Sequence, residues 1–203
     1  MGAKSRGEVG RGSVTLAPNC GMLVRGIVVS IGDRSMLGVY ALEELQQEIA
    51  ANPQQWRPLV FTNGCFDLLH AGHVRYLQAA RALGQRLVIG LNSDGSVRGI
   101  KPQATGLPPR PIVPEQQRAE VLSALKAVDG VVIFHEPTAI AVIQALQPDI
   151  YVKGGDYAVS TLPEAPTVQA YGGRIELIQI EIPSSTSAII QRIRHPVDVA
   201  LQP

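Results

Sequence analysis

Short apolar runs that alternate with helical patterns are the feature that most constrains the fold of this chain. Five runs are rich in β-branched and aliphatic residues and are only three to six residues long; they cover residues 59–62, 87–91, 131–134, 150–152 and 175–180. Strands separated by helices are typical of βαβ units, in which parallel strands are covered by helices on both faces. The alternation therefore predicts an α/β chain, a Rossmann-like α/β/α sandwich around a mostly parallel five-stranded sheet.

The segments between these runs carry apolar residues at the spacing of an amphipathic helix. Four helices are expected, and each is marked by three apolar residues. These are Val74, Leu77 and Leu83; Ala119, Leu122 and Leu125; Ile140, Ile143 and Leu146; and Ile189, Ile190 and Ile193. A further short helix is expected within Tyr40–Ala51, closed by Asn52 and Pro53.

Residues 1–38 differ from the rest of the chain. They are rich in Gly and Arg and show no sustained period, so we expect a flexible N-terminal extension or a stretch upstream of the true start, with Met36 opening a more orderly segment. Their positive charges are scattered, which does not favour a basic binding arm. Residues 39–203 are expected to form a single domain with its core at about 59–194.

Composition excludes several classes of protein. A hydrophobic content of 45% with 17% charged residues is sufficient for a core. A net charge of +1 favours neither nucleic acid nor an anionic membrane as a partner. Two cysteines cannot make a disulfide framework, and no apolar run approaches the length of a membrane span. We expect a soluble cytoplasmic protein.

Parallel sheets place ligands beyond the carboxyl ends of their strands, where the strand order reverses. The first long run leads through Gly64 to a helix that is expected to begin near His70–His73. The start of a helix offers free N–H groups and a partial positive charge to a phosphate. Because His70 and His73 are three residues apart, their imidazoles face the same side, and Gly72 adds no bulk between them. The segment predicts an anion clamp.

Other interpretations of the two histidines are weaker. Zinc needs a third and usually a fourth ligand, and the remaining His and Cys residues show no matching spacing. Incidental surface histidines are the other alternative. The chain has neither a P-loop nor the dinucleotide-binding Gly-x-Gly-x-x-Gly pattern after the strand.

The His-x-Gly-His motif, preceded by Asn-Gly-x-Phe-Asp, resembles the nucleotidyltransferase superfamily, which includes cytidylyltransferases and pantetheine-phosphate adenylyltransferase. Further segments resemble the narrower family of D-glycero-β-D-manno-heptose 1-phosphate adenylyltransferases; they are residues 61–77, 90–94, 118–122, 152–157 and 185–187. The two-histidine motif alone specifies the superfamily. The later Gly-Gly-Asp-Tyr and Ser-Thr-Ser segments point to the narrower family, over about residues 59–194.

The resemblance implies roles for individual residues. As catalytic groups it implies His70, His73, Lys101 and Arg118. As nucleotide- or substrate-binding residues it implies Thr62, Asn63, Cys65, Phe66, Gly72, Asn92, Asp94, Gly154, Asp156, Tyr157, Ser185, Thr186 and Ser187.

Several of these residues also have structural interpretations. The Asn92–Asp94 segment equally suits a helix cap, and one residue of the Ser-Thr-Ser run is expected to be an N-cap. Arg118 could instead pair with Glu115 or Glu120. Asp67 is expected to brace its turn by accepting backbone N–H bonds rather than to bind metal. The loop after Lys101 is longer than the family's usual run.

The implied reaction is transfer of AMP from ATP to a sugar 1-phosphate, which releases pyrophosphate and forms ADP-heptose. The attacking phosphate is mostly ionised at neutral pH, so no general base is needed. Mg²⁺ is expected to be held mainly by phosphates and water, with no dedicated protein metal site. The alternatives are a cytidylyltransferase acting on glycerol 3-phosphate or a similar phosphorylated alcohol, and a nucleotide-binding regulator without turnover. The resemblance also implies a homo-oligomer, a dimer, and a functional link to a separate heptose kinase.

Overall fold

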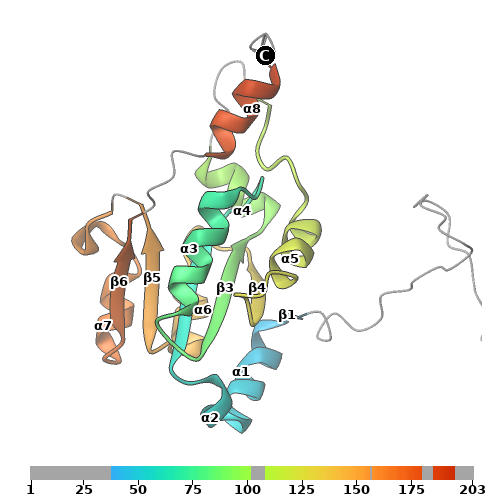
Figure 1. Cartoon of the computed structure of the whole chain (residues 1–203). Coiled ribbons are helices and arrows are strands. Elements are labelled where there is room, and N and C mark those ends of the chain that lie inside the picture. Colours follow the sequence, from blue (N-terminus) through green and yellow to red (C-terminus); the bar gives the residue numbers. More distant parts are fainter. Residues whose placement is uncertain (1–37, 102–107, 156, 180–184, 195–203) are drawn as a thin grey trace, which may run out of the picture. The chain divides into compact units, whose positions relative to one another are not determined.

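The computed structural model describes residues 38–101, 108–155, 157–179 and 185–194. Strands and helices alternate along the described chain (Figure 1). The strands are β1 (Val39–Tyr40), β2 (Leu59–Gly64), β3 (Arg86–Asn92), β4 (Gly130–Phe134), β5 (Ile150–Gly154) and β6 (Arg174–Ile178). The helices are α1 (Leu42–Ala51), α2 (Pro53–Trp56), α3 (Ala71–Arg81), α4 (Asp94–Ile100), α5 (Glu115–Ser123), α6 (Ile140–Leu146), α7 (Ala165–Ala170) and α8 (Thr186–Arg194), with a 3-10 turn, η2, at Val159–Thr161.

The strands form one sheet in the order β1-β4-β3-β2-β5-β6, and all five neighbouring pairs are parallel. The chain adds β3 and β4 on one side of β2 and then crosses to the other side of β2 for β5. The strand order therefore reverses between β2 and β5, which is where a parallel sheet opens a crevice for ligands. The expected α/β sandwich with a parallel sheet is confirmed.

The expected number of five strands is wrong, because β1 is a sixth. It has two residues, and it pairs with β4 through Val39 opposite Val131 and Tyr40 opposite Val132. A run this short has no detectable period, so the sequence pattern merged it with the helix that follows. The predicted extension, residues 1–38, lies outside the described residues except for Gly38.

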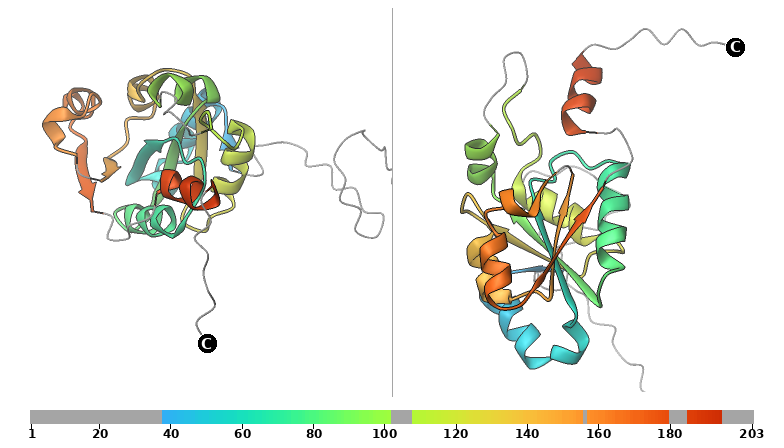
Figure 2. Two further views of the ribbon diagram at one scale, coloured as in Figure 1. Left: turned by 90° about the horizontal axis from the view of Figure 1, so that it is seen from above. Right: turned by 90° about the vertical axis from the view of Figure 1, so that its left-hand side faces the viewer.

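Helices cover both faces of the sheet, as the views in Figure 2 show. Helices α1, α6 and α7 pack on one face in a cluster with Phe61, Val88 and Tyr151. Helices α3 and α5 pack on the other face in a cluster with Val60 and Ile89. Because neighbouring residues of β2 point to opposite faces, one apolar strand serves both clusters. Within the described ranges, no helix is both long and apolar enough to cross a membrane.

Candidate active site

A cavity of about 510 Å³ opens at the carboxyl ends of the central strands. Its floor includes Asn63 and Gly64 of β2, Asn92 of β3, and Lys153 and Gly154 of β5. These ends flank the point at which the strand order reverses. The cavity therefore lies where the sheet topology predicts a ligand.

The two histidines stand at the start of α3 with their rings stacked. The ring centroids of His70 and His73 are 3.9 Å apart and the ring planes are inclined by 26°. His70 is the extended N-cap residue, and its carbonyl accepts the first helical bond from the N–H of Val74 at 3.2 Å. The N–H groups of Ala71, Gly72 and His73 therefore lack intrahelical acceptors. The predicted arrangement of both imidazoles on one side of the first turn is what the structure has.

The imidazoles are short of hydrogen-bond partners. The Nδ1 atoms of both His70 and His73 are buried and have no partner among the described residues. A buried nitrogen without a partner is unfavourable unless a ligand satisfies it. Burial lowers the pKa of His73 to about 4, with a smaller contribution from His70, and burial also lowers the pKa of His70. Both rings are thus neutral at pH 7 in the ligand-free protein.

The turn before the helix is shaped by Gly64 and Phe66. Phe66 has a φ of 40°, in the left-handed region that L-residues rarely adopt. Its ring centroid lies 5.4 Å from that of His73. A Cβ on Gly64 would lie 3.0 Å from the Phe66 ring, so the absence of a side chain at Gly64 lets this ring turn in beside His73.

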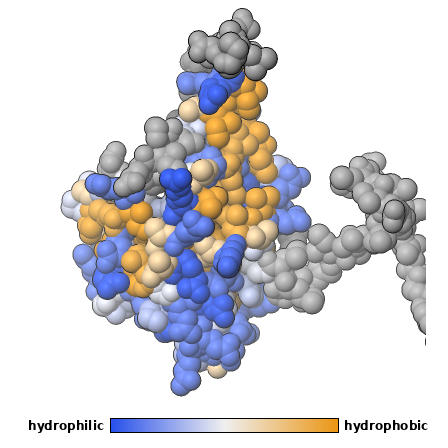
Figure 3. Space-filling view, in the orientation of Figure 1, coloured by the Kyte–Doolittle hydropathy of each residue, from blue (hydrophilic) through white to orange (hydrophobic). Residues whose placement is uncertain are grey.

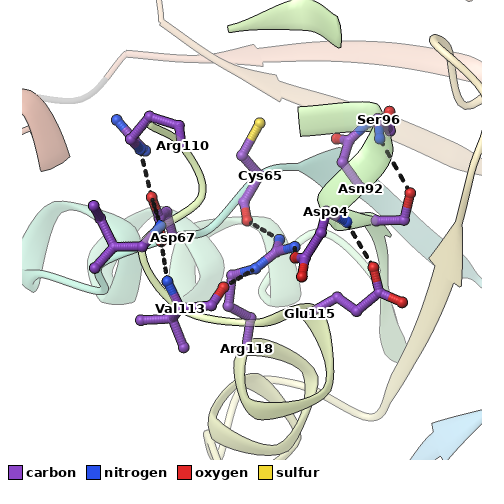
Figure 4. Close-up of polar contacts among 11 residues, drawn as sticks. Cys65, Asp67, Asn92, Asp94, Ser96, Arg110, Val113, Glu115 and Arg118 are labelled. Atoms are coloured by element: carbon purple, nitrogen blue, oxygen red, sulfur yellow. Dashed lines mark hydrogen bonds and ion pairs between the residues drawn. The ribbon is translucent and has the colours of Figure 1, made fainter. Parts of the chain in front are cut away.

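Asp67 holds a second segment against this turn. Its fully buried carboxylate accepts a hydrogen bond from the Nε of Arg110, and also the backbone N–H groups of Ile112 and Val113, both at 2.9 Å (Figure 4). The expectation that Asp67 accepts backbone N–H bonds is confirmed, although the donors belong to the segment before α5 and not to its own turn. Each carboxylate oxygen is therefore already engaged.

Arg118 of α5 lies beneath the site and not in its cavity wall. Its side chain is fully buried, and its guanidinium donates to three acceptors: the carbonyl of Val113 at 2.9 Å, the carbonyl of Cys65, and Asp94 Oδ1 at 2.7 Å (Figure 4). The alternative pairing of Arg118 with Glu115 or Glu120 is absent among its described contacts, although its role is structural in this arrangement. Glu115 instead accepts the backbone N–H of Asp94 at 2.6 Å.

Most predicted binding residues line the cavity. They are Asn63, Cys65, Phe66, His73, Asn92, Lys101, Gly154, Tyr157, Ser185, Thr186 and Ser187. The described part of the wall does not include Thr62, His70, Gly72, Asp94 or Arg118. Asp156 lies outside the described residues. The structure thus brings together residues from β2, β3, β5, α3 and α8, and leaves Arg118 and Asp94 behind them.

Both expected caps are present. Ser93 is the N-cap of α4 and accepts the N–H of Ser96 at 3.2 Å, while the neighbouring Asn92 faces the cavity. Ser185 Oγ accepts the N–H of Ala188 at 3.1 Å at the start of α8. Within Asn92–Asp94, Ser93 caps α4, Asn92 lines the cavity, and Asp94 binds Arg118.

Thr62 has a structural partner instead of a ligand-facing position. Its hydroxyl shares a 2.6 Å hydrogen bond with Tyr76, whose hydroxyl also donates to the carbonyl of Val152 at 3.2 Å. This bridge ties α3 to β2 and β5. Burial of the Tyr76 hydroxyl raises its pKa, so the bridge stays neutral at physiological pH.

Sequence reasoning missed three charged residues of the wall, Arg110, Lys153 and Glu164. Lys153 lies near the carboxyl end of β5, within a segment that carries the family resemblance, and this position was a usable signal. Glu164 belongs to no sequence motif. It reaches the cavity from the turn before α7. Its contribution depends on tertiary folding alone.

The cavity does not hold a ready-made metal centre in the part of the chain that the structure describes. No group of three or more His, Cys, Asp or Glu side chains is placed to bind a metal ion there. Asp67, the carboxylate nearest the histidine turn in sequence, is occupied by Arg110 and backbone N–H groups. A divalent ion that entered this cavity would therefore take most of its ligands from a bound phosphate and from water.

Several known proteins are similar to this chain. The profile of the cytidylyltransferase-like family matches residues 61–197. The "Bifunctional protein HldE" of Syntrophotalea carbinolica is 50% identical over 151 residues, which is 74% of this chain and 30% of that protein. The protein of the same name from Citrifermentans bemidjiense is 50% identical over 152 residues, 75% of this chain and 30% of that protein. That from Magnetococcus marinus is 44% identical over 187 residues, 92% of this chain and 37% of that protein.

The chain thus spans about a third of the length of these curated relatives. The matched family segment begins within β2, includes the stacked histidines, and extends past α8. It therefore contains most of the residues around the cavity. The chain belongs to the cytidylyltransferase-like family.

Proposed function

We propose that the chain is an adenylyltransferase that transfers AMP from ATP to D-glycero-β-D-manno-heptose 1-phosphate, forming ADP-heptose and pyrophosphate. One observation carries the transfer chemistry: the stacked pair His70 and His73, with unpartnered buried Nδ1 atoms, at a helix start beside the cavity. Family membership and the bifunctional relatives support nucleotidyl transfer. The choice of a heptose phosphate is supported by the motif resemblance after β5 and before α8.

The geometry favours catalysis by positioning and hydrogen bonding. A phosphate whose second pKa is about 6 is already a nucleophile at neutral pH, so it attacks the α-phosphorus of ATP without a protein base. The α3 N–H groups and the two imidazoles donate to the triphosphate tail as pyrophosphate leaves. A neutral imidazole still supplies one N–H donor, and a bound polyphosphate draws a proton toward it. Arg118 acts as a positioning residue through Cys65 and Asp94.

A divalent ion is general for nucleotidyl transfer with ATP, and we propose Mg²⁺. The chain's own residues fit an ion that arrives with the nucleotide, because the described carboxylates form no cage. When bound, the ion supplies charge neutralisation on the phosphates. Lys101 and the Ser185–Ser187 segment also line the cavity, which supports a role for them in orienting the same phosphates.

A pyrophosphate-release assay tests this function against its nearest rival. The rival is a cytidylyltransferase that acts on glycerol 3-phosphate, consistent with the family's description. The protein is given ATP or CTP, each with heptose 1-phosphate or glycerol 3-phosphate. We expect release above background with ATP and heptose 1-phosphate. Release confined to CTP with glycerol 3-phosphate would establish the rival, and no release with any pair would support a binding protein without turnover.

The ratio kcat/KM should be nearly independent of pH between about 7 and 9. Burial holds the pKa of His73 at about 4 and lowers that of His70, so neither ring changes charge in this range in the free enzyme. Burial also raises the pKa of the Cys65 thiol. Initial rates at substrate concentrations well below KM, which report groups of the free enzyme, test this expectation. A steep rise that follows one titrating group would contradict a mechanism without a general base.

We further propose two partners. The first is a functional link to a separate heptose kinase that supplies the sugar 1-phosphate, which is supported by the motif resemblance and is consistent with relatives that are longer and named bifunctional. A homodimer is supported by the apolar surface over α8 and the region below it in Figure 3, where Ile193 of α8 is 71% exposed.

A further inference from the structure

The cavity has two chemically different walls. On the α3 side of the sheet it is lined by His73 and by the Ser185–Ser187 segment. On the α6 and α7 side it is lined by Thr138, Thr161 and Glu164, with Lys153 on the floor at the end of β5. The proposed phosphate chemistry uses the first wall. The second wall has no role in it.

Lys153 is held in place by a buried polar network. Its Nζ donates to Asn63 Oδ1 at 2.8 Å, and the same oxygen accepts the Tyr151 hydroxyl at 2.8 Å. The ammonium also lies 5.8 Å from the centroid of the Tyr151 ring. Since an ammonium has three donors, Lys153 keeps two for a ligand as far as the described residues are concerned. Burial lowers its pKa, and the negative charge of Glu164 partly opposes this shift.

Glu164 is the complementary group. It is only 3% exposed, and its described hydrogen bond from a backbone N–H, that of Ala139, is a long one of 3.4 Å. Burial is the main cause that raises the pKa of the Tyr151 hydroxyl, and the charge of the adjacent Glu164, together with a hydrogen bond to it, raises it further. Yet Glu164 and Lys153 form no direct ion pair in the described structure. Lys153 is only partly buried, and the two opposite charges stay apart, so Lys153 keeps donors and the Glu164 carboxylate keeps acceptor sites beyond its contacts with Ala139 and Tyr151.

We propose that Glu164 and Lys153 bind the sugar hydroxyl groups of the acceptor, so that the α7-side wall is the acceptor subsite. The proposal rests on the proposed function. A hydroxyl group donates to a carboxylate and accepts from an ammonium at the same time, so it fits between the two side chains. The hydroxyls of Thr138 and Thr161 on the same wall add further polar contacts.

Two other occupants fit this wall less well. A phosphate would meet the buried carboxylate of Glu164 and be repelled by it. An adenine edge would satisfy one donor and one acceptor, but a purine is mostly a flat face that prefers apolar or aromatic contact. The wall offers four polar side chains, namely Lys153, Thr138, Thr161 and Glu164. A ligand with several hydroxyl groups uses more of them.

Steady-state kinetics of Glu164→Gln test the assignment. The variant keeps the shape of the side chain and removes its charge. We expect the KM for heptose 1-phosphate to rise at least tenfold, on the scale of losing a hydrogen bond to a charged group, while the KM for ATP changes less than twofold. Lys153→Met should also raise the KM for heptose 1-phosphate. Glu176→Gln is the matched control, because Glu176 lies in β6, outside the described cavity wall, and pairs with the exposed Arg174.

The outcomes separate this inference from the proposed function. Absence of pyrophosphate release by the unaltered protein overturns the function and the inference with it. The inference alone is overturned by a different result. In that case the unaltered protein releases pyrophosphate normally, but Glu164→Gln leaves the KM for heptose 1-phosphate unchanged or raises only the KM for ATP. If Glu164→Gln does not fold, acceptors that lack single hydroxyl groups are compared on the unaltered protein. At least one of these acceptors must have a kcat/KM tenfold lower than that of heptose 1-phosphate. Equal kcat/KM values for all of them would refute the subsite.

Discussion

Replacing His73 with alanine is expected to lower the turnover number at least a hundredfold. The ring is placed by its stack on His70, by Phe66, and by the first turn of α3, so it meets the phosphates without reorganisation. Loss of one such preorganised donor typically costs about 10²- to 10³-fold in turnover. Because the donor acts mainly as pyrophosphate leaves, the KM for ATP should change much less than the turnover number. Pyrophosphate release at saturating ATP measures the effect.

His135→Ala is the matched control for this experiment. His135 is exposed after β4 and is absent from the described cavity wall, so its loss should leave turnover within twofold. His70→Ala should resemble His73→Ala, because removal of either ring breaks the stack. A reduction of less than threefold in both variants would exclude the role proposed for the histidine pair.

Replacing Arg118 with methionine is expected to destabilise the fold by about 3–5 kcal/mol. The substitution keeps a long apolar stem but removes the donors for two carbonyls and for Asp94 Oδ1 in a site where Arg118 is 1% exposed. These acceptors are partly buried, with the Asp94 side chain 26% exposed, and they would lose their charged partner. Urea unfolding followed by circular dichroism measures the free energy of unfolding.

The control for Arg118 is Arg174→Met on β6. Arg174 forms an ion pair with Glu176 at 2.9 Å, but its side chain is 59% exposed, so its loss should cost under about 1 kcal/mol. Arg118→Lys should recover little, because an ammonium cannot span three acceptors set in the plane of a guanidinium. Equal stability of the Arg118 and Arg174 variants would mean that the buried contacts of Arg118 contribute little.

Features that repeat locally along the chain could be predicted from the sequence. The apolar runs that became β2 to β6 are strands of five to seven residues, buried along most of β2 to β5 and partly exposed in β6, and such runs are visible without any tertiary information. The histidine pair was equally accessible, because spacing within one helical turn fixes which side chains share a face. Strand β1 was not accessible, since its two residues gain their conformation from pairing with β4.

Roles set by distant partners could not be predicted. Arg118 was expected among the catalytic groups, but its acceptors come from segments 5, 24 and 53 residues away in the chain. Glu164 reaches the cavity only because α7 packs against α6 beside the end of β5. Such placements are decided by how the layers pack, and a single sequence carries no period or spacing that reports them.

The brevity of β1 has a consequence for association between molecules. A long exposed edge strand offers a row of free backbone groups to which another chain can add a strand, and this is a common start of aggregation. Here β1 covers Val131 and Val132 of β4 and presents a ladder of only two residues of its own. Among the described residues, the β1 edge of the sheet therefore provides a poorer template for intermolecular β-sheet growth than the opposite edge, β6, which has five residues.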